Sequence, residues 1–507
     1  MSLEILNVNE DYADYLRDES RRAGHAEKIV FPKSANEVRE ALQAAAENNW
    51  PVTVQGGRTG ITGGCVPEGG LILNLSRMNA IGEIKGDQMT VQSGALLDDI
   101  RKAVCGIADP AMFFPPDPTE TTASIGGMVA NNASGARSFK YGAVRNWIHA
   151  LEVVLANGET IWVERGKHKV AGLGFKLGSI SGEIPIIPYL NRCGTTGVKN
   201  AAGYFVKPDM DLVDLFIGAE GTLGIVTEIT IKLLPKPEQL NCLVAFFASE
   251  EEALGFVRFL RGAGSTPPPT ACTAGGSPAP RAGSPLPPTA IEFFDAQALE
   301  LLRRMKAGNT AFADLPELKT EFHTAIYFEY DTEVPDAVVE KAGEAIDCWF
   351  AEGEHEIETL KNFRHAVPEA VNMLIGERKK TIPELTKLGT DMSVPDDQME
   401  TVMHMYHEGL AEAGLEYAIF GHIGNNHVHV NIIPRSMEEY EAGKALYLDW
   451  ARQVVAMSGS VSAEHGIGKN KTDFLRLMYG DDGICKMRKL KHLFDPAGLL
   501  NPGNLFL

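Results

Sequence analysis

Three histidines stand close together in the last quarter of the chain, where residues 417–433 read as a strand, a Gly-Asn-Asn turn and a second strand. In such a hairpin His427 and His429 share a face because they are two residues apart, and His422 can lie opposite them across the turn. Divalent metals of borderline softness bind imidazole readily, so the grouping favours a metal site. The alternative, hydrogen-bonded histidines of a sheet, stays open at this point.

A carboxylate lies beside a fourth histidine farther on, in the glycine-containing stretch 462–468. Adjacent side chains usually diverge, so Glu464 and His465 are expected to perform different tasks. A divalent metal held by His422, His429 and Glu464 would leave positions open for a substrate, and His465 would remain free as a general base. This arrangement is typical of a catalytic site.

Five glycines occur in the ten residues 55–64, directly after a strand expected at residues 51–54. Such a loop lets backbone N–H groups converge on an anion without interference from Cβ atoms, and a diphosphate is the natural guest. The spacing matches neither the G-x-G-x-x-G nor the G-x-x-x-x-G-K-[ST] motif, so neither a Rossmann nor a P-loop site is indicated. The alternative is a tight turn without a ligand.

Two further clusters combine glycine with polar side chains. Residues 115–118 and 124–135 carry prolines, glycines and amides that can hydrogen-bond a flavin or a ribityl chain, and residues 218–227 form a third glycine-rich segment. Either cluster alone would be weak evidence for a ligand. The order of all three along the chain is the stronger observation.

The elements that must position these residues follow from local patterns. Ser34 and Glu37 form a capping box that opens a helix, in which Val38, Leu42 and Ala45 fall at helical spacing. Strands are expected at residues 51–54, 71–75, 89–92, 151–155 and 160–163, the last two joined by a hairpin turn at residues 156–158. The first half of the chain is therefore α+β.

Composition restricts the remaining possibilities. The 507 residues suffice for two or three domains, and the net charge of −20 argues against a nucleic-acid ligand, so an anionic substrate would need a locally basic pocket. Seven widely spaced cysteines indicate neither a disulfide framework nor an iron–sulfur site. No stretch approaches the roughly 18 to 20 apolar residues of a membrane span, and no secretory signal opens the chain. A cytoplasmic location is expected, with peripheral attachment at the inner face of a membrane left open.

The segment 262–288 is rich in proline, alanine, glycine and serine. It cannot bury enough apolar surface to offset the entropy of ordering it, so we expect a flexible surface insertion. A docking segment in polyproline conformation is the alternative.

The three glycine clusters resemble the FAD-binding half of the vanillyl-alcohol-oxidase superfamily, also called the PCMH-type FAD domain. The resemblance implies two α+β subdomains, with the pyrophosphate on the first cluster and the flavin near the other two. The cofactor-binding residues that it implies are Gly56, Gly57, Arg58, Thr59, Gly60, Gly63, Gly64, Pro116, Asp117, Ser124, Gly127, Asn132, Gly135, Glu220, Gly224, Ile225 and Asn501. Members that bind FAD covalently use a histidine in the first loop, where this chain has Arg58-Thr59, so non-covalent FAD is expected.

The histidine and glutamate motifs, together with residues 494–503, resemble the FAD-linked oxidase C-terminal domain of the glycolate oxidase subunit, D-lactate dehydrogenase and D-2-hydroxyglutarate dehydrogenase group. The resemblance implies a ferredoxin-like antiparallel sheet with helices. It also implies zinc or manganese on His422, His429 and Glu464, with His465 as the base.

In that family an arginine binds the substrate carboxylate, and Arg364 matches it, with a helix-surface charge as the alternative. The chain departs from the family at His427, which is either a further ligand or a modifier of the metal preference. It departs again at Gly389, where the dicarboxylate enzymes have lysine, and this favours D-lactate or glycolate over D-2-hydroxyglutarate. The basic residues that could replace that lysine are Lys387, Arg378, Lys379 and Lys380.

We therefore expect an FAD-binding domain at residues 1–235, a substrate domain at 236–460, and a segment 461–507 that returns to the active site. The expected reaction is oxidation of a small D-2-hydroxy acid by hydride transfer to FAD. The alternatives are an FAD-dependent transferase of the alkylglycerone-phosphate synthase type and a zinc hydrolase. Electrons are expected to leave to an external acceptor: an electron-transfer flavoprotein, a quinone, a cytochrome or an iron–sulfur subunit. Both a monomer and a homo-oligomer stay open.

Overall fold

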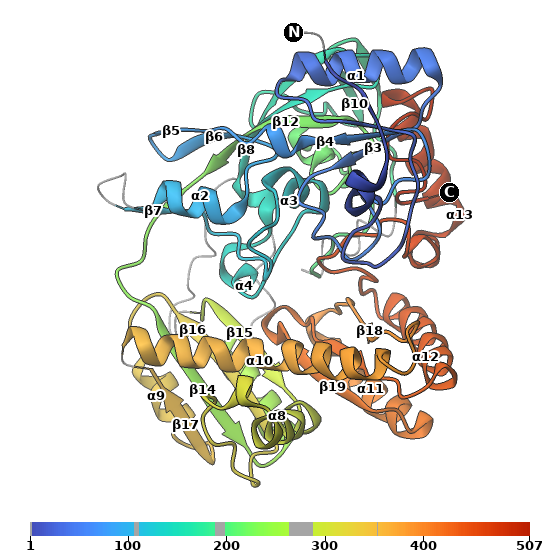
Figure 1. The fold of residues 1–507 in the computed structure, drawn as a ribbon. Helices are drawn as coiled ribbons and strands as arrows, with labels where there is room; N and C mark the ends of the chain where they lie inside the picture. The colour runs from blue at the N-terminus through green and yellow to red at the C-terminus, as the bar shows by residue number, and fades with distance from the viewer. Residues whose placement is uncertain (1–2, 106–110, 188–197, 263–286, 352, 507) are drawn as a thin grey trace.

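The computed structural model describes residues 3–105, 111–187, 198–262, 287–351 and 353–506. Figure 1 shows two lobes, one holding the N-terminal part of the chain together with the last long helix, the other holding one large sheet. Most of the segment expected to be a flexible insertion, residues 263–286, lies outside the described residues. The fold is mixed α+β, as expected.

The first sheet has four strands in the order β1-β2-β4-β3, and β2, β4 and β3 are parallel. Its strands are β1 (Leu6–Asn7), β2 (Lys28–Val30), β3 (Val52–Gln55) and β4 (Leu71–Asn74). Helix α1 (Ala35–Asn48) packs on it, and the predicted cap is present because Ser34 Oγ accepts from Glu37 N at 3.3 Å. The glycine-rich loop of residues 55–64, predicted to bind a diphosphate, thus begins where β3 ends.

The second sheet has five antiparallel strands in the order β5-β6-β12-β8-β9. They are β5 (Ile81–Lys85), β6 (Gln88–Gln92), β8 (Ile148–Val154), β9 (Thr160–Glu164) and β12 (Ile225–Lys232), and β8 and β9 form the predicted hairpin. Two small two-stranded sheets pair β7 (Met112–Phe113) with β13 (Leu234–Pro235) and β10 (Gly174–Leu177) with β11 (Ile180–Glu183). The helices of this lobe are α2 (Leu97–Val104), α3 (Ile125–Asn131), α4 (Ser138–Tyr141) and α6 (Val213–Phe216), with 3-10 turns η1 (Glu10–Leu16), η2 (Leu75–Arg77) and η3 (Val144–Trp147).

The third sheet forms the centre of the other lobe and has seven antiparallel strands in the order β17-β14-β16-β15-β19-β20-β18. They are β14 (Asn241–Phe247), β15 (Ala290–Phe294), β16 (Thr324–Tyr330), β17 (Asp347–Phe350), β18 (Leu388–Gly389), β19 (Tyr417–Gly421) and β20 (His429–Ile432). Alternate residues of β14 face opposite ways: Val244 and Phe246 enter one core and Leu243 and Ala245 the other.

Helices cover both faces of this sheet. Helices α8 (Ala296–Gly308) and α10 (Glu354–Lys379) share one core with it, whereas α7 (Glu250–Leu260), α9 (Asp336–Ala342) and α11 (Met399–Ala413) contribute to the other. The 3-10 turns η4 (Thr310–Phe312), η5 (Asp396–Gln398) and η6 (Ile423–Asn425) complete the lobe. Because both faces of the sheet are buried, we expect polar side chains that face a ligand to lie at the ends of its strands.

The predicted histidine hairpin is present, but its turn is longer than expected. Strands β19 and β20 pair with Phe420 opposite His429, and η6 lies between them. His427 therefore belongs to the loop and not to a strand, so the argument that it shares a strand face with His429 is wrong. The loop folds back because His427 N donates to the His422 carbonyl at 3.2 Å, and this still brings the rings together.

The end of the chain returns to the first lobe. Helix α12 (Met437–Ala456) contacts α13 (Thr472–Phe494), which is kinked at Gly480, where φ is +66°. Leu500 then bridges Val52 of β3, and Asn501 Oδ1 accepts from Val54 N at 2.7 Å. No helix of the described residues is long and apolar enough to cross a membrane.

A buried carboxylate ties α8 to the strand that leads into the histidines. Asp295 Oδ1 accepts from Ala298 N at 2.8 Å and from Ile419 N at 3.1 Å, whereas Oδ2 has no hydrogen-bond partner among the described residues. Burial raises the pKa of Asp295 to about 7. This carboxylate is therefore costly to ionise in place.

Replacement of Asp295 by asparagine should stabilise the folded protein increasingly as the pH rises. The unfolded chain releases this proton near 3.8 and the folded chain near 7, so the wild type loses stability between these values, by up to about 4 kcal/mol. Asparagine keeps an oxygen for both N–H groups and carries no charge. Melting temperatures of Asp295→Asn and the wild type at pH 5 and pH 8 test this, with the exposed Asp314→Asn as control. A difference that does not grow with pH would contradict it.

Candidate active site

One cavity of about 370 Å³ is lined by residues of all three glycine clusters, a size within the roughly 300 to 1,000 Å³ of ligand sites. Of the residues predicted to bind the cofactor, those at its wall are Gly56, Gly57, Arg58, Thr59, Gly60, Gly64, Ser124, Gly127, Glu220, Gly224, Ile225 and Asn501. Glu464 and His465 line the same cavity. The loop of residues 55–64, predicted to bind a diphosphate, and the loop of residues 462–468, predicted to be catalytic, therefore face the same cavity. We call the second one the catalytic loop.

Close packing between two of the clusters explains one glycine. A Cβ atom on Gly56 would lie 2.1 Å from Ser124 Oγ, and Gly57 N donates to the same hydroxyl at 3.1 Å. Ser124 also caps α3, because its hydroxyl accepts from Gly127 N at 3.3 Å. The backbone N–H groups of the first loop are thus presented beside a helix N-terminus, which suits a diphosphate.

Five predicted cofactor residues do not line this cavity: Gly63, Pro116, Asp117, Asn132 and Gly135. Four of them brace the second cluster instead. Asp117 pairs with Arg101 at 2.8 Å, Pro116 O accepts from the same guanidinium, and a Cβ on Gly135 would lie 1.7 Å from Asp117 O. Asn132 ends α3 at φ +48° and accepts from Arg145 N at 3.1 Å.

The N-terminal segment forms part of the cavity wall, and the sequence patterns did not predict this. Arg58 adopts φ +59°, stacks 4.2 Å from the ring centroid of Tyr15, and donates to the Asp14 carbonyl at 2.6 Å. Asp18 lines the cavity beside them. No local pattern could have shown this contact, because it joins segments about forty residues apart.

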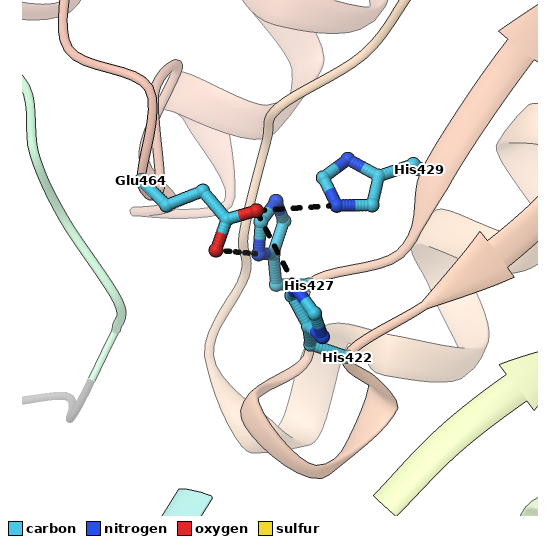
Figure 2. Close-up of side chains that lie close together, drawn as sticks. All are labelled: His422, His427, His429 and Glu464. Carbon is cyan, nitrogen blue, oxygen red and sulfur yellow. Dashed lines mark ion pairs between the residues drawn. The ribbon is translucent and has the colours of Figure 1, made fainter. Parts of the chain in front are cut away.

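Figure 2 shows the side chains that were predicted to bind a metal, together with His427, and we call this group the metal-type cluster. Its three imidazoles surround one carboxylate. Glu464 Oε1 lies 3.4 Å from His422 Nε2 and 3.4 Å from His429 Nε2. Glu464 Oε2 lies 4.0 Å from His427 Nδ1 and 2.7 Å from Lys199 Nζ. Four residues thus offer ligand atoms that lie within 4.8 Å of one another: His422, His427, His429 and Glu464.

Each imidazole of the cluster has an oxygen beside its other ring nitrogen. His422 Nδ1 lies 2.6 Å from Glu292 Oε1, and His429 Nδ1 lies 2.9 Å from the Thr390 carbonyl. Such partners fix the ring and leave the second nitrogen for a metal. The donor set of nitrogen and carboxylate oxygen therefore fits a divalent ion of the zinc or manganese type.

The charged side chains at the cluster compensate one another when no metal is bound. Although burial raises the pKa of Glu464, Lys199 and His422 hold that pKa well below its usual range. Burial lowers the pKa of His422, but Glu292 and Glu464 raise it to about 9. A cation that bound here would have to displace that proton.

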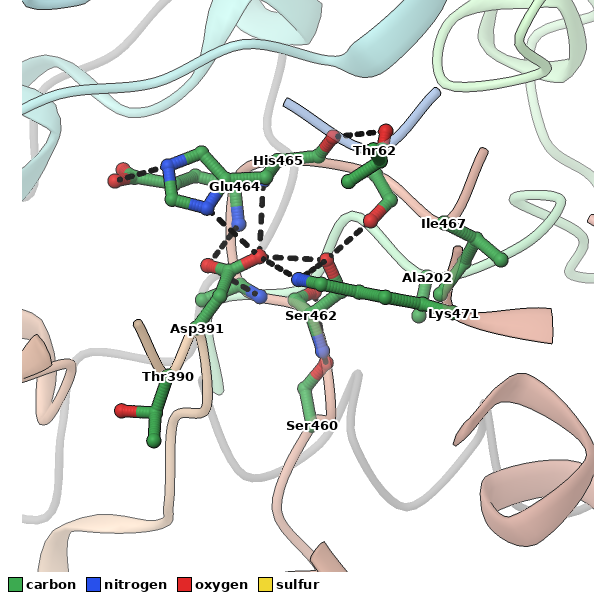
Figure 3. A network of polar contacts seen from close by, with 12 residues as sticks. Thr62, Ala202, Thr390, Asp391, Ser460, Ser462, Glu464, His465, Ile467 and Lys471 are labelled. Carbon is green, nitrogen blue, oxygen red and sulfur yellow. Dashed lines mark hydrogen bonds and ion pairs between the residues drawn. The ribbon is translucent and has the colours of Figure 1, made fainter. Parts of the chain in front are cut away.

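Asp391 holds the catalytic loop, as Figure 3 shows. Its carboxylate accepts from the N–H groups of Ala463, Glu464 and His465 at 3.1 to 3.2 Å, and from Ser462 Oγ and Lys471 Nζ at 2.7 and 2.8 Å. Asp391 Oδ2 also lies 3.3 Å from His465 Nδ1, and His465 Nε2 faces Glu464 Oε1 at 3.5 Å. His465 is therefore oriented with Nε2 toward the cluster.

Arg364 lies in α10 and reaches the cluster only through Glu292, whose Oε2 is 4.0 Å from Arg364 Nε. It lines a second cavity of about 470 Å³ between the lobes, together with Arg137, Lys361 and Asp117. Residues Pro118 and Thr119 line both cavities. The arginine is nearly buried, with 10% of its side chain exposed, so the alternative of a helix-surface charge is wrong.

Comparisons with known proteins agree with this geometry. The family described as "FAD binding domain" matches residues 26–164, and the family described as "FAD linked oxidases, C-terminal domain" matches residues 279–505. Glycolate oxidase subunit GlcD of Bacillus subtilis (strain 168) is 30% identical over 94% of this chain and 88% of its own length. The chain belongs to the FAD-linked oxidoreductases of the 2-hydroxy-acid dehydrogenase group.

Other relatives support the same family. D-lactate dehydrogenase of Anaerostipes hadrus is 28% identical over 99% of this chain and 94% of its own length. D-2-hydroxyglutarate dehydrogenase of Stutzerimonas stutzeri (strain A1501) is 27% identical over 94% and 90%. A solved alkyldihydroxyacetonephosphate synthase has a TM-score of 0.63 at 14% identity, covering 98% of this chain and 82% of that one, and this likeness shows the fold alone.

Several residues of the site were missed by the sequence analysis. Glu292, Lys199 and Asp391 touch the metal-type cluster or the catalytic loop, yet each of them bonds to a group there that is 70 or more residues away in the sequence. Asp391 alone had a signal, since it stands two residues after Gly389, a position already compared with the family.

The close approach at Gly56 yields a test of the cofactor cavity. Gly56→Ala places a methyl group against Ser124 Oγ, so we expect the loop to shift and the FAD content of the purified protein to fall. The measurement is the ratio of flavin to protein absorbance. Gly376→Ala in α10 is the control, because a Cβ there meets no atom within 4 Å. Full FAD occupancy in Gly56→Ala would show that this contact does not shape the cavity.

Proposed function

We propose that this FAD-linked oxidoreductase oxidises a small D-2-hydroxy acid, D-lactate or glycolate, to the 2-oxo acid. The observation that carries the proposal is the position of His465. Its ring is held by Asp391 at Nδ1, and its Nε2 faces the metal-type cluster at the wall of the cavity assigned to FAD. A base, a cation-binding cluster and a flavin cavity in contact suit oxidation of an alcohol next to a carboxylate.

His465 takes the hydroxyl proton at Nε2, since Asp391 stabilises the resulting imidazolium through Nδ1. Arg364 pairs with the substrate carboxylate, since its side chain lines the second cavity and its Nε lies 4.0 Å from Glu292, the carboxylate beside His422. Zinc or manganese, when bound by His422, His429 and Glu464, would polarise the substrate oxygens. FAD, when bound, supplies the acceptor for the hydride from C2.

Two features support non-covalent FAD. The first loop carries Arg58 and Thr59 where a linking histidine would stand. Cys65 also lines the cavity, but burial and Asp18 raise the pKa of its thiol, so the reactive thiolate is disfavoured. We further propose that electrons leave to a separate carrier.

The choice of a monocarboxylate rests on the basic residues near Gly389. Arg378 is engaged by Glu416 and the Ile433 carbonyl, and Lys380 pairs with Glu377 at 2.7 Å. Arg378 is therefore committed elsewhere, whereas the Lys380–Glu377 pair is exposed to solvent and leaves Lys380 available. Lys387, two residues from Gly389, keeps D-2-hydroxyglutarate as the second candidate substrate.

Removal of His465 should slow the reductive reaction without loss of cofactor. We expect His465→Ala to lower the anaerobic rate of flavin bleaching by D-lactate or glycolate by ~10²-fold or more, as general-base loss usually does. The exposed His404→Ala is the control. Bleaching at the wild-type rate in His465→Ala, with FAD retained, would refute the base assignment.

Arg364→Ala should raise KM for the hydroxy acid by roughly 10- to 100-fold, because a charge-assisted hydrogen bond of about 1.5 to 3 kcal/mol is lost. Lys361→Ala is a matched control, since Lys361 lies one helical turn away in α10 and lines the same cavity. Equal changes in KM for the two variants would indicate a general effect of charge and no specific pairing.

A further inference from the structure

We propose that His427 is a fourth protein ligand of the metal, and that the reaction therefore requires a six-coordinate ion such as manganese or iron(II) in place of zinc. The inference rests on the metal-binding part of the proposed function. It concerns a residue at which this chain departs from its family, so the sequence of the family does not contain the answer.

The first argument is that His427 is oriented in the same way as the two predicted ligands. In each ring one nitrogen faces an outer oxygen, and for His427 this is Nε2, 3.2 Å from Asp391 Oδ1. The other nitrogen faces Glu464, and for His427 this is Nδ1. A carboxylate behind an imidazole is the usual outer partner of a ligating histidine. His427 thus has the same arrangement of oxygens, although its Nε2 lies near Asp391 without a hydrogen bond among the described residues, whereas the outer contacts of His422 and His429 are hydrogen bonds.

The second argument concerns what His427 already contacts. Its Nδ1 lies 3.4 Å from Lys199 Nζ, and that ammonium also lies 2.7 Å from Glu464 Oε2. The two ligand atoms of His427 and Glu464 thus face one cation that the protein itself supplies. A divalent ion would make the same two contacts in place of Lys199.

The third argument is proximity and burial. The His427 ring is fully buried, and its centroid lies 4.4 Å from that of His429 and 5.4 Å from that of His422. The near nitrogens of all three rings and an oxygen of Glu464 fall within 4.8 Å of one another. His465, by contrast, lies outside this group and groups instead with Asp391 and Glu464. Glu464 belongs to both groups, so it links the histidine ligands to the base.

A fourth protein ligand changes which metal can serve the reaction. Zinc is usually four-coordinate, and three imidazoles with one carboxylate would already complete that number. A substrate that binds through its hydroxyl and its carboxylate needs two more positions. Manganese and iron(II) accept six ligands of mixed nitrogen and oxygen type, so they leave those positions open.

The test uses the FAD-loaded protein, stripped of metal with a chelator and reloaded with Mn²⁺ or Zn²⁺. X-ray absorption spectroscopy of the bound ion counts imidazoles and total ligands without interference from the flavin. We expect three imidazoles and about six ligands for Mn²⁺ in the wild type. His427→Ala should lose one imidazole and weaken Mn²⁺ binding by more than the roughly 100-fold of an outer-shell change.

His427→Asn, a smaller neutral substitution, is the second variant if His427→Ala does not fold, as judged by FAD content. His404→Ala is the surface control. Lys199→Met removes the competing ammonium and should leave Mn²⁺ binding as tight or tighter. Two imidazoles in the wild type, or an unchanged spectrum and affinity in His427→Ala, would overturn the proposal. Flavin bleaching by D-lactate and by glycolate is recorded separately, so failure of the reaction is distinguishable from failure of the ligand set.

Discussion

The site depends on one buried carboxylate, that of Asp391. It is 1% exposed and gathers three consecutive backbone N–H groups of the loop that carries Glu464 and His465. Although burial raises the pKa of Asp391, the neighbouring His465 and Lys471 hold that pKa well below its usual range. Because the same carboxylate lies beside both His427 and His465, it sets the orientation of a cluster histidine and of the base together.

Two other buried carboxylates connect the site to the two lobes. Glu292, from the large sheet, contacts His422 and lies near Arg364. Glu220, from the third glycine cluster, accepts from Ile467 N and Gly468 N at 2.7 and 2.8 Å, and so fixes the other end of the catalytic loop. Burial raises the pKa of Glu220 to about 7, which shows the cost of placing an acid there. The loop is thus positioned by both lobes.

Local sequence patterns predicted those features whose contacts are also local. The Ser34 cap, the β8–β9 hairpin and the convergence of His422 with His429 all arise from residues within fifteen positions of one another. The glycine clusters predicted loops that line one cavity, but not that Asp117 and Gly135 brace one another beside it. Glu292 and Lys199 carry no signal of their own, since an isolated charged residue in a strand or loop is common. They contact the site only because segments that are far apart in the sequence meet in the fold.

That return has a consequence for the order in which the protein becomes functional. The loop at Gly56 is synthesised before Asn501, which bonds the neighbouring strand β3 and lines the same cavity. A ribosome-bound chain therefore carries an incomplete cavity until Asn501 has emerged. A chain interrupted before α13 would lack that part of the wall and would present an exposed seam to proteases and chaperones.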